Sequence, residues 1–338
     1  MTMKRLTDIM ATVTDARCDA NFLKSLRRAG MDSVRINSAH VDGEGLRRII
    51  RAVRRHVPGV GILMDTKGPE IRTTALDGVL ESISFAEGDQ VMIAEGAATS
   101  SGAIGIAVDG VCRALRKGDR VVLDDGAMEL SVSRADGDRV EAVVTLGGEL
   151  GSRKTVNLPD TDLPPLPAVS ERDRRAIEVA VEERIDMIAH SFVRSAADVE
   201  AVRALVSGTD IRVYAKIECR DAIRNFNGIL EAADGILVAR GDLGTQIDVA
   251  TIPAVQHKAC SLAHDAGKPV IVSTQILTSM VDHPYPTRAE MTEVAFAVRD
   301  GVETLLLTGE TAQGHFPEEC VDAMRRCIEA SQTYFGTL

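Results

Sequence analysis

Short, almost continuously apolar segments alternate along the chain with longer segments in which apolar positions recur every three or four residues. The first pattern is typical of a strand buried on both faces, and the second is typical of an amphipathic helix. Eight such pairs follow one another, which indicates βα units around a parallel sheet. The apolar segments are 8–13, 33–37, 60–66, 186–192, 212–217, 235–240, 269–274 and 304–309. We therefore expect an α/β fold, specifically a TIM (β/α)₈ barrel.

This alternation breaks between residues 73 and 154, where apolar and polar positions alternate in period 2 between Gly and Asp turns. The segment predicts a small all-β domain inserted after the third strand, so that 1–72 and 155–338 form the barrel. The insertion lies on the side of such a barrel where active sites form. It is therefore interpreted as a lid that excludes water, with a decorative insertion as the alternative.

Helix limits carry the expected signals. Ser170 precedes a predicted helix as its N-cap, with Asp173 in the first turn, and Gly267 followed by Pro269 ends the helix before the seventh strand.

Charge and cysteine content narrow the function classes. The chain has 39 basic and 50 acidic side chains and a net charge of −11, which disfavours nucleic acid and anionic membranes as partners. An anionic substrate must then meet a local basic pocket. The six cysteines include no CxxC pair, no apolar run reaches the ~18 residues of a membrane span, and the start shows no signal peptide. We expect a cytoplasmic protein.

Polar side chains gather at the C-terminal ends of the predicted strands, which meet at the catalytic face of a βα barrel. They are Arg35, Asn37, Asp65, Thr66, Lys67, Lys216, Glu218, Arg240, Asp242, Thr274, Gln275 and Glu310.

Glu218 and Asp242 follow neighbouring strands and are hard oxygen ligands suited to Mg²⁺ or Mn²⁺. The plainer alternative is that each carboxylate only pairs with a nearby cation. Lys216 lies two residues before Glu218 on a period-2 strand, so it points to the same face. Its ammonium could neutralise a transferring phosphoryl group or an enolate oxygen. The backbone at Gly241 and Asp242 could cradle an anionic group.

Several longer motifs resemble those of the pyruvate kinase family, in order from the first strand to the last helix. The motifs are DTKGPEIR (65–72), AKIE (215–218), DGILVARGDLG (234–244), PTRAE (286–290) and TGETAQG (308–314). The resemblance implies phosphoryl transfer from phosphoenolpyruvate to ADP, giving pyruvate and ATP, as a step of glycolysis.

The resemblance also assigns roles to single residues. It implies Arg35 as a phosphate contact, Lys216 as the cation that assists transfer, and Thr274 near the point where the enolate is protonated. The remaining assignments are Gly241, Asp242 and Thr274 for the substrate carboxylate, Glu218 and Asp242 for Mg²⁺ or Mn²⁺, Asn37, Asp65 and Thr66 for K⁺, and Arg72, Lys154 and His40 for the nucleotide.

Some features depart from the family pattern. The family's GPAS turn after the first strand is replaced by Thr14–Arg17, and Ala39 stands where a serine is usual before His40. The family's C-terminal regulatory domain is expected to be missing, and with it allosteric control and a tetramer formed through that domain. A homodimer through barrel helices stays open.

Three functions therefore stay open. The first is phosphoryl transfer to ADP, and the second is an enolpyruvate or 2-oxo acid enzyme that works without ADP, such as a lyase, a decarboxylase or an enzyme with another acceptor. The third is a non-catalytic paralogue that senses a phosphorylated metabolite. The altered turn favours the second function, and the complete set of Lys216, Glu218, Asp242 and Thr274 disfavours the third.

Overall fold

The computed structural model describes residues 6–78, 80–163 and 166–337, so the predicted outer limits of the barrel, 1 and 338, lie outside the described residues. The chain divides into two compact units. The first comprises the segments up to Gly68, Ala168–Arg240 and from Thr251 onward, and the second comprises Pro69–Pro167 with Gly241–Ala250. The predicted limits of the insertion, 73–154, stay a prediction.

Within the described residues, eight parallel strands close into a barrel in the order β1-β16-β15-β14-β13-β12-β3-β2. They are β1 (Asp8–Val13), β2 (Ser33–Asn37), β3 (Gly61–Asp65), β12 (Met187–His190), β13 (Arg212–Ile217), β14 (Gly235–Ala239), β15 (Val270–Ser273) and β16 (Thr304–Leu307). Every residue of β12, β14 and β15 is buried, as their continuous apolar sequences require. The TIM (β/α)₈ barrel is therefore confirmed.

Alternate residues of the strands pack against one another inside this barrel. The buried cluster is Met10, Leu63, Met187, Ala189, Tyr214, Leu237, Ala239, Ile271 and Leu306. Because side chains alternate between the two faces of a strand, the intervening residues face the surrounding helices. The interior is thus a packed core, and the polar residues at the strand ends lie above it.

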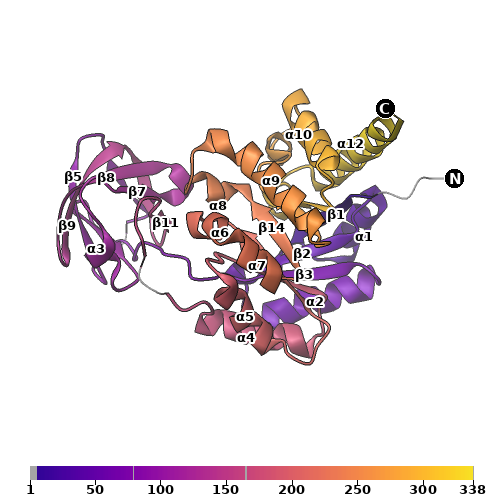
Figure 1. Cartoon of the computed structure of the whole chain (residues 1–338), viewed down its shortest axis with the longest axis horizontal. Coiled ribbons are helices and arrows are strands. Elements are labelled where there is room, and N and C mark those ends of the chain that lie inside the picture. The colour runs from indigo at the N-terminus through magenta and orange to yellow at the C-terminus, as the bar shows by residue number, and fades with distance from the viewer. Residues whose placement is uncertain (1–5, 79, 164–165, 338) are drawn as a thin grey trace. The chain divides into compact units, whose positions relative to one another are not determined.

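Helices follow the strands and flank them in the first unit (Figure 1). They are α1 (Ala20–Ala29), α2 (Gly43–His56), α4 (Glu171–Glu182), α5 (Ala196–Leu205), α6 (Arg220–Arg224), α7 (Phe226–Ala232), α9 (Ile252–Asp265), α10 (Arg288–Arg299), α11 (Gly309–Ala312) and α12 (Pro317–Thr337), with 3₁₀ turns η1 (Ser38–His40) and η4 (Thr278–Val281). Two further elements, α8 (Arg240–Gly244) and η3 (Val249–Thr251), belong mostly to the second unit. As predicted, Ser170 caps α4, accepting a hydrogen bond from the Asp173 N–H. No helix in the described part of the chain is long and apolar enough to cross a membrane.

The second unit is built mainly from β-strands, which confirms a β-sheet domain inserted after β3 (Figure 1). Among its described residues, a six-stranded sheet has the order β11-β7-β8-β9-β5-β6, and β10 pairs with β4. The elements are β4 (Ser82–Phe85), β5 (Gln90–Glu95), β6 (Ala103–Ile106), α3 (Val111–Ala114), β7 (Arg120–Leu123), η2 (Asp124–Gly126), β8 (Met128–Asp136), β9 (Arg139–Leu146), β10 (Gly148–Gly151) and β11 (Val156–Asn157). Its own apolar core includes Ile93, Leu130 and Val144, so it is a domain in its own right.

Candidate active site

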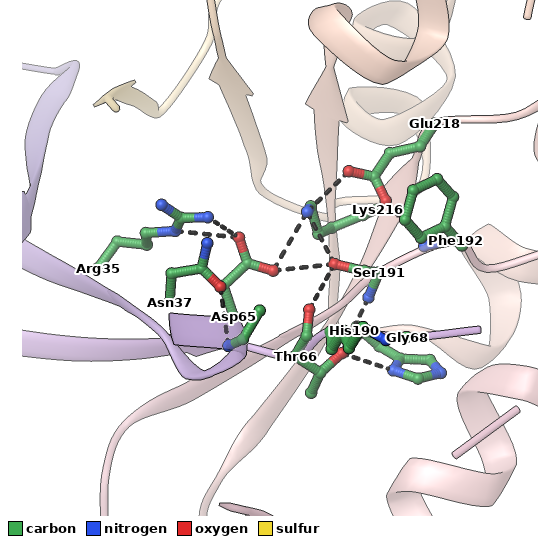
Figure 2. Close-up of polar contacts among 12 residues, drawn as sticks. Arg35, Asn37, Asp65, Thr66, Gly68, His190, Ser191, Phe192, Lys216 and Glu218 are labelled. Atoms are coloured by element: carbon green, nitrogen blue, oxygen red, sulfur yellow. Dashed lines mark hydrogen bonds and ion pairs between the residues drawn. The ribbon is translucent and has the colours of Figure 1, made fainter. Parts of the chain in front are cut away.

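Charged side chains from three barrel strands meet at the C-terminal end of the barrel (Figure 2). Arg35 lies on β2, Asp65 ends β3, and Lys216 lies on β13. The register of the sheet places Asn37 beside Asp65. The parallel strands thus bring together residues that are up to 181 positions apart in sequence, and Glu218 follows directly after β13.

Asp65 is the centre of this group. Its Oδ2 accepts hydrogen bonds from Arg35 Nε and Nη2 at 3.0 and 2.6 Å, and its Oδ1 lies 3.1 Å from Lys216 Nζ. Burial by itself would raise the pKa of this carboxyl, but the charges of Lys216 and Arg35 and their hydrogen bonds hold the pKa below its usual range. Asp65 is therefore an anion at neutral pH.

Lys216 links the two carboxylates. Its Nζ lies 2.7 Å from Glu218 Oε1 and donates to Ser191 Oγ at 2.8 Å. Glu218 is fully buried, and its Oε2 accepts a hydrogen bond of 2.7 Å from the Phe192 N–H. We define Arg35, Asp65, Lys216 and Glu218 as the charge array. It alternates positive and negative groups in a site where little water screens them.

Ser191, which the sequence did not single out, joins the array to the backbone directly after β3. Its hydroxyl lies 3.0 Å from Asp65 Oδ1 and 2.7 Å from the Thr66 carbonyl oxygen. In the sequence it lay near the end of the predicted fourth strand, 186–192, and in the structure it directly follows β12. Gly68 approaches Ser191 closely: it has φ +67°, and a Cβ there would lie 2.4 Å from the Ser191 carbonyl oxygen. Only glycine fits this position of the DTKGPEIR motif.

A buried histidine contacts the side chain of Thr66. His190 is fully buried, and its Nδ1 lies 3.0 Å from Thr66 Oγ1 (Figure 2). Burial lowers the pKa of His190 to about 4, so the ring is neutral at neutral pH. The Thr66 hydroxyl also accepts a hydrogen bond from the Ser191 N–H. The loop after β3 is therefore held from two directions.

The loop after β15 is held by Arg240. Thr274, predicted as a catalytic residue, has φ 65°, and Gln275 has φ 53°. Arg240 donates to the Thr274 carbonyl oxygen from both Nε and Nη2. Burial lowers the pKa of Arg240 to about 10, so it stays charged at neutral pH.

Other predicted residues lie in the second unit. Gly241 and Asp242 belong to it and lie in α8, directly after β14. Arg72 pairs with Glu70 at 2.7 Å, and Lys154 pairs with Asp124 at 3.0 Å. Within this unit, both predicted nucleotide contacts are thus oriented by carboxylates.

The remaining predicted residues near the strand ends lie in the first unit. His40 is exposed at the end of η1. The Lys67 N–H donates to Asp173 at 2.8 Å, so the first helical turn of α4 fixes the start of the DTKGPEIR loop. Glu310 is buried and accepts hydrogen bonds from the N–H groups of Leu277 and Thr308, which makes it a brace between two loops.

The oxygen donors suit the predicted ions. Among the described residues, no group of three or more His, Cys, Asp or Glu side chains could hold a metal. An ion such as Mg²⁺ takes one or two carboxylates from a protein and its other ligands from substrate and water. Glu218 is one such carboxylate. Asn37, Asp65 and Thr66 each offer at least one oxygen atom of the kind that coordinates K⁺; the Asn37 Oδ1 also accepts a hydrogen bond from the Ala39 N–H.

The altered turn after β1 is held by two arginines. Arg17 donates to the carbonyl oxygens of Gly314 and Gln313 at 2.6 and 3.2 Å, and Asp15 pairs with Arg48 at 2.6 Å. The Arg48 hydrogen bond lowers the pKa of Asp15. This turn is therefore tied to the loop that follows α11.

Comparison with known proteins agrees with this geometry. The model of the pyruvate kinase barrel domain matches residues 4–321. Pyruvate kinase of Borreliella burgdorferi is 35% identical over 325 residues, which cover 95% of this chain and 67% of that protein. Human pyruvate kinase PKLR is 40% identical over 94% of this chain and 58% of its own length, and the Geobacillus stearothermophilus pyruvate kinase is 39% identical over 96% and 56%. The chain thus spans only about three fifths of the length of these relatives. With the barrel, the inserted sheet domain and the matched motifs, these findings mean that the chain belongs to the pyruvate kinase family.

Proposed function

We propose that the chain transfers the phosphoryl group of phosphoenolpyruvate to ADP, giving pyruvate and ATP, and so serves glycolysis. The observation that supports this most directly is the buried charge array around Lys216, 2.7 Å from Glu218 and 3.1 Å from Asp65. Such an ammonium is fixed by its anionic partners and needs no reorganisation when negative charge develops next to it. The relatives named pyruvate kinase in these comparisons make this the reaction class to test first.

The proposed reaction uses few protein groups. An oxygen of the ADP terminal phosphate attacks phosphorus, the bond from phosphorus to the enol oxygen breaks, and the electron pair stays on that oxygen as an enolate. Lys216 stabilises the enolate oxygen, and Arg35 orients the phosphoryl group. A proton then reaches the methylene carbon from the side of Thr274, and Gly241 and Asp242 hold the substrate carboxylate.

Ions and nucleotide complete the proposal. Glu218 and Asp242 would hold Mg²⁺ or Mn²⁺, which would supply charge neutralisation to the transferring phosphoryl group. Asn37, Asp65 and Thr66 would hold K⁺. The nucleotide would be held by Arg72, Lys154 and His40. Closure of the inserted domain as a lid and a homodimer formed through barrel helices remain predictions.

A second candidate function keeps the enolpyruvate pocket and does not use ADP. The turn after β1 favours it, because Arg17 and Asp15 occupy the place of the family's GPAS turn and are committed to protein partners. Such an enzyme would cleave or decarboxylate an enolpyruvate or 2-oxo acid, or would pass phosphate to another acceptor.

One coupled assay separates the functions. Pyruvate production from phosphoenolpyruvate is followed with and without ADP, Mg²⁺ and K⁺. Pyruvate formed only with ADP and the divalent ion supports phosphoryl transfer, and pyruvate or carbon dioxide formed without ADP supports the second function. Binding of phosphoenolpyruvate without turnover under every condition would contradict both and leave a sensing role.

A further inference from the structure

A buried guanidinium holds the backbone that carries Thr274. Arg240 Nη2 donates to the carbonyl oxygens of Thr274 and Gln275 at 2.6 and 3.1 Å, and Nε donates to those of Thr274 and Ser273 at 3.2 and 3.4 Å. Three consecutive carbonyl groups therefore point at one side chain. The flat, forked arrangement of donors makes arginine suited to such a contact.

The backbone that Arg240 holds is unfavourable in itself. Thr274 and Gln275 both have positive φ, 65° and 53°, a region that residues with a Cβ rarely enter and that is especially costly for a β-branched threonine. Such a conformation persists only where its surroundings fix it, and it is concentrated at functional sites. The contacts of Arg240 with three backbone carbonyls fix this conformation.

The other side of the guanidinium is anchored to two helices. Arg240 Nη1 pairs with Glu293 on α10 and lies 3.4 Å from Gln256 Oε1 on α9. Only 8% of Arg240 is exposed, and Gln256 is 1% exposed. The ion pair offsets the cost of burying the cation. Arg240 thus joins the end of β14 and the loop after β15 to the helical layer.

We propose that Arg240 is a positioning residue of the active site: it keeps the Thr274–Gln275 turn in the left-handed conformation and so aims Thr274 at the reacting centre. It also directly precedes Gly241 and Asp242 in sequence. The inference rests on the proposed function, because Thr274 has its role only there. Arg240 acts through Thr274, whose carbonyl oxygen it holds.

The test compares Arg240→Gln with Arg240→Lys. For Arg240→Gln we expect kcat to fall by about 100-fold, the loss typical of a small misplacement of a reacting group, while KM for ADP changes by less than about twofold. Arg240→Lys should recover part of kcat, because an ammonium can still donate to one or two of the carbonyls. Hydrogen exchange at the amides of residues 274–277 should become faster in Arg240→Gln and less so in Arg240→Lys.

Arg203→Gln is the matched control, because Arg203 also donates to a carbonyl, that of Ala232 at 2.6 Å, and pairs with Asp234 at 3.2 Å, before the start of β14. It should lower stability and leave kcat within about twofold. If Arg240→Gln does not fold, Glu293→Gln takes its place, since it keeps the carbonyl contacts but removes the anchor, and should lower kcat by about tenfold.

Two results would overturn the proposal. One is a folded Arg240→Gln, or Glu293→Gln in its place, with unchanged kcat and unchanged exchange at 274–277. The other is an equal loss of kcat in Arg203→Gln. If the wild-type protein forms no pyruvate, the proposed function fails by itself, and hydrogen exchange still decides whether Arg240 holds the turn.

Discussion

Replacing Lys216 by methionine removes the centre of the charge array while keeping a side chain of similar length. At 2.7 Å from Glu218 and 3.1 Å from Asp65, each attraction is worth about 5–6 kcal/mol at an effective dielectric constant of about 20, before the cost of desolvation is subtracted. Removing one partner of a buried pair typically lowers the free energy of unfolding by about 3–5 kcal/mol, because a charge is left unpaired. Arg35 still pairs with Asp65, so we expect the lower end of this range and a folded variant.

The loss of stability in Lys216→Met should depend on pH. The pKa of Asp65 in the folded wild type is below its usual range, so its stabilisation is present above the unfolded pKa of about 3.9 and is lost as pH falls through the lower folded value. In the variant, the charge of Lys216 no longer opposes the effect of burial, so the pKa of Asp65 should be higher than in the wild type. The difference in unfolding free energy between the two proteins should therefore be largest near pH 7 and narrow toward pH 4, as measured by urea denaturation.

Turnover should fall as well as stability. Loss of one fixed hydrogen-bond donor to a developing oxyanion lowers kcat by about 100- to 1,000-fold. Lys216 is a full positive charge, so its removal should lower kcat by an amount near the upper end of this range. The assay is pyruvate formation with saturating phosphoenolpyruvate, ADP and Mg²⁺, with Lys258→Met, exposed on α9, as the control. Unchanged turnover in a folded Lys216→Met protein would remove Lys216 from the mechanism and refute the reasoning from the array.

Three further substitutions test the support of the array. Gly68→Ala should lower the free energy of unfolding, measured by urea denaturation, by about 1–3 kcal/mol, because the residue has positive φ and its new Cβ would lie 2.4 Å from the Ser191 carbonyl oxygen. A loss below about 0.5 kcal/mol would contradict this. Ser191→Ala should lower the free energy of unfolding by about 1–3 kcal/mol, because Lys216 and Asp65 each lose a buried hydrogen-bond partner. An unchanged urea midpoint would argue against this role of Ser191. Glu218→Gln should raise the Mg²⁺ concentration needed for half-maximal turnover by at least about tenfold, and an unchanged Mg²⁺ titration would remove Glu218 as a ligand.

The barrel could be predicted from the sequence because its strands are apolar on both faces and so appear as short continuous apolar segments. The helices between them differ, since their apolar positions recur every three or four residues. The same rule explains the position of the array. Lys216 and Glu218 are two residues apart at the end of a strand, so period 2 alone predicts that they face the same way, and they lie 2.7 Å apart. The parallel order of the strands then brings Asp65 to them.

The support of these residues could not be predicted in the same way. Ser191 and Arg240 act through hydrogen bonds to backbone carbonyls, and a sequence does not show which carbonyl will lie nearby. The left-handed turn at Thr274 could not be predicted from the sequence either. Positive φ is usually found at Gly or Asn, but here it occurs at Thr274 and Gln275. Sequence patterns thus indicate which groups carry charge at the site, and tertiary packing decides what orients them.

The charge balance of the array leads to a prediction about metal removal. Arg35 and Lys216 are matched by Asp65 and Glu218, and the protein as a whole carries a net charge of −11. The array alone therefore has no surplus positive charge for phosphoenolpyruvate, which carries a carboxylate and a phosphate. A divalent cation should thus be needed for binding as well as for chemistry. Titration calorimetry with phosphoenolpyruvate should show heat of binding with Mg²⁺ and at least about tenfold weaker binding after treatment with EDTA, a loss of about 1.4 kcal/mol or more. Equal affinity in both conditions would mean that other cations of the chain neutralise the substrate, and the assignment of Glu218 as a metal ligand would lose its physical reason.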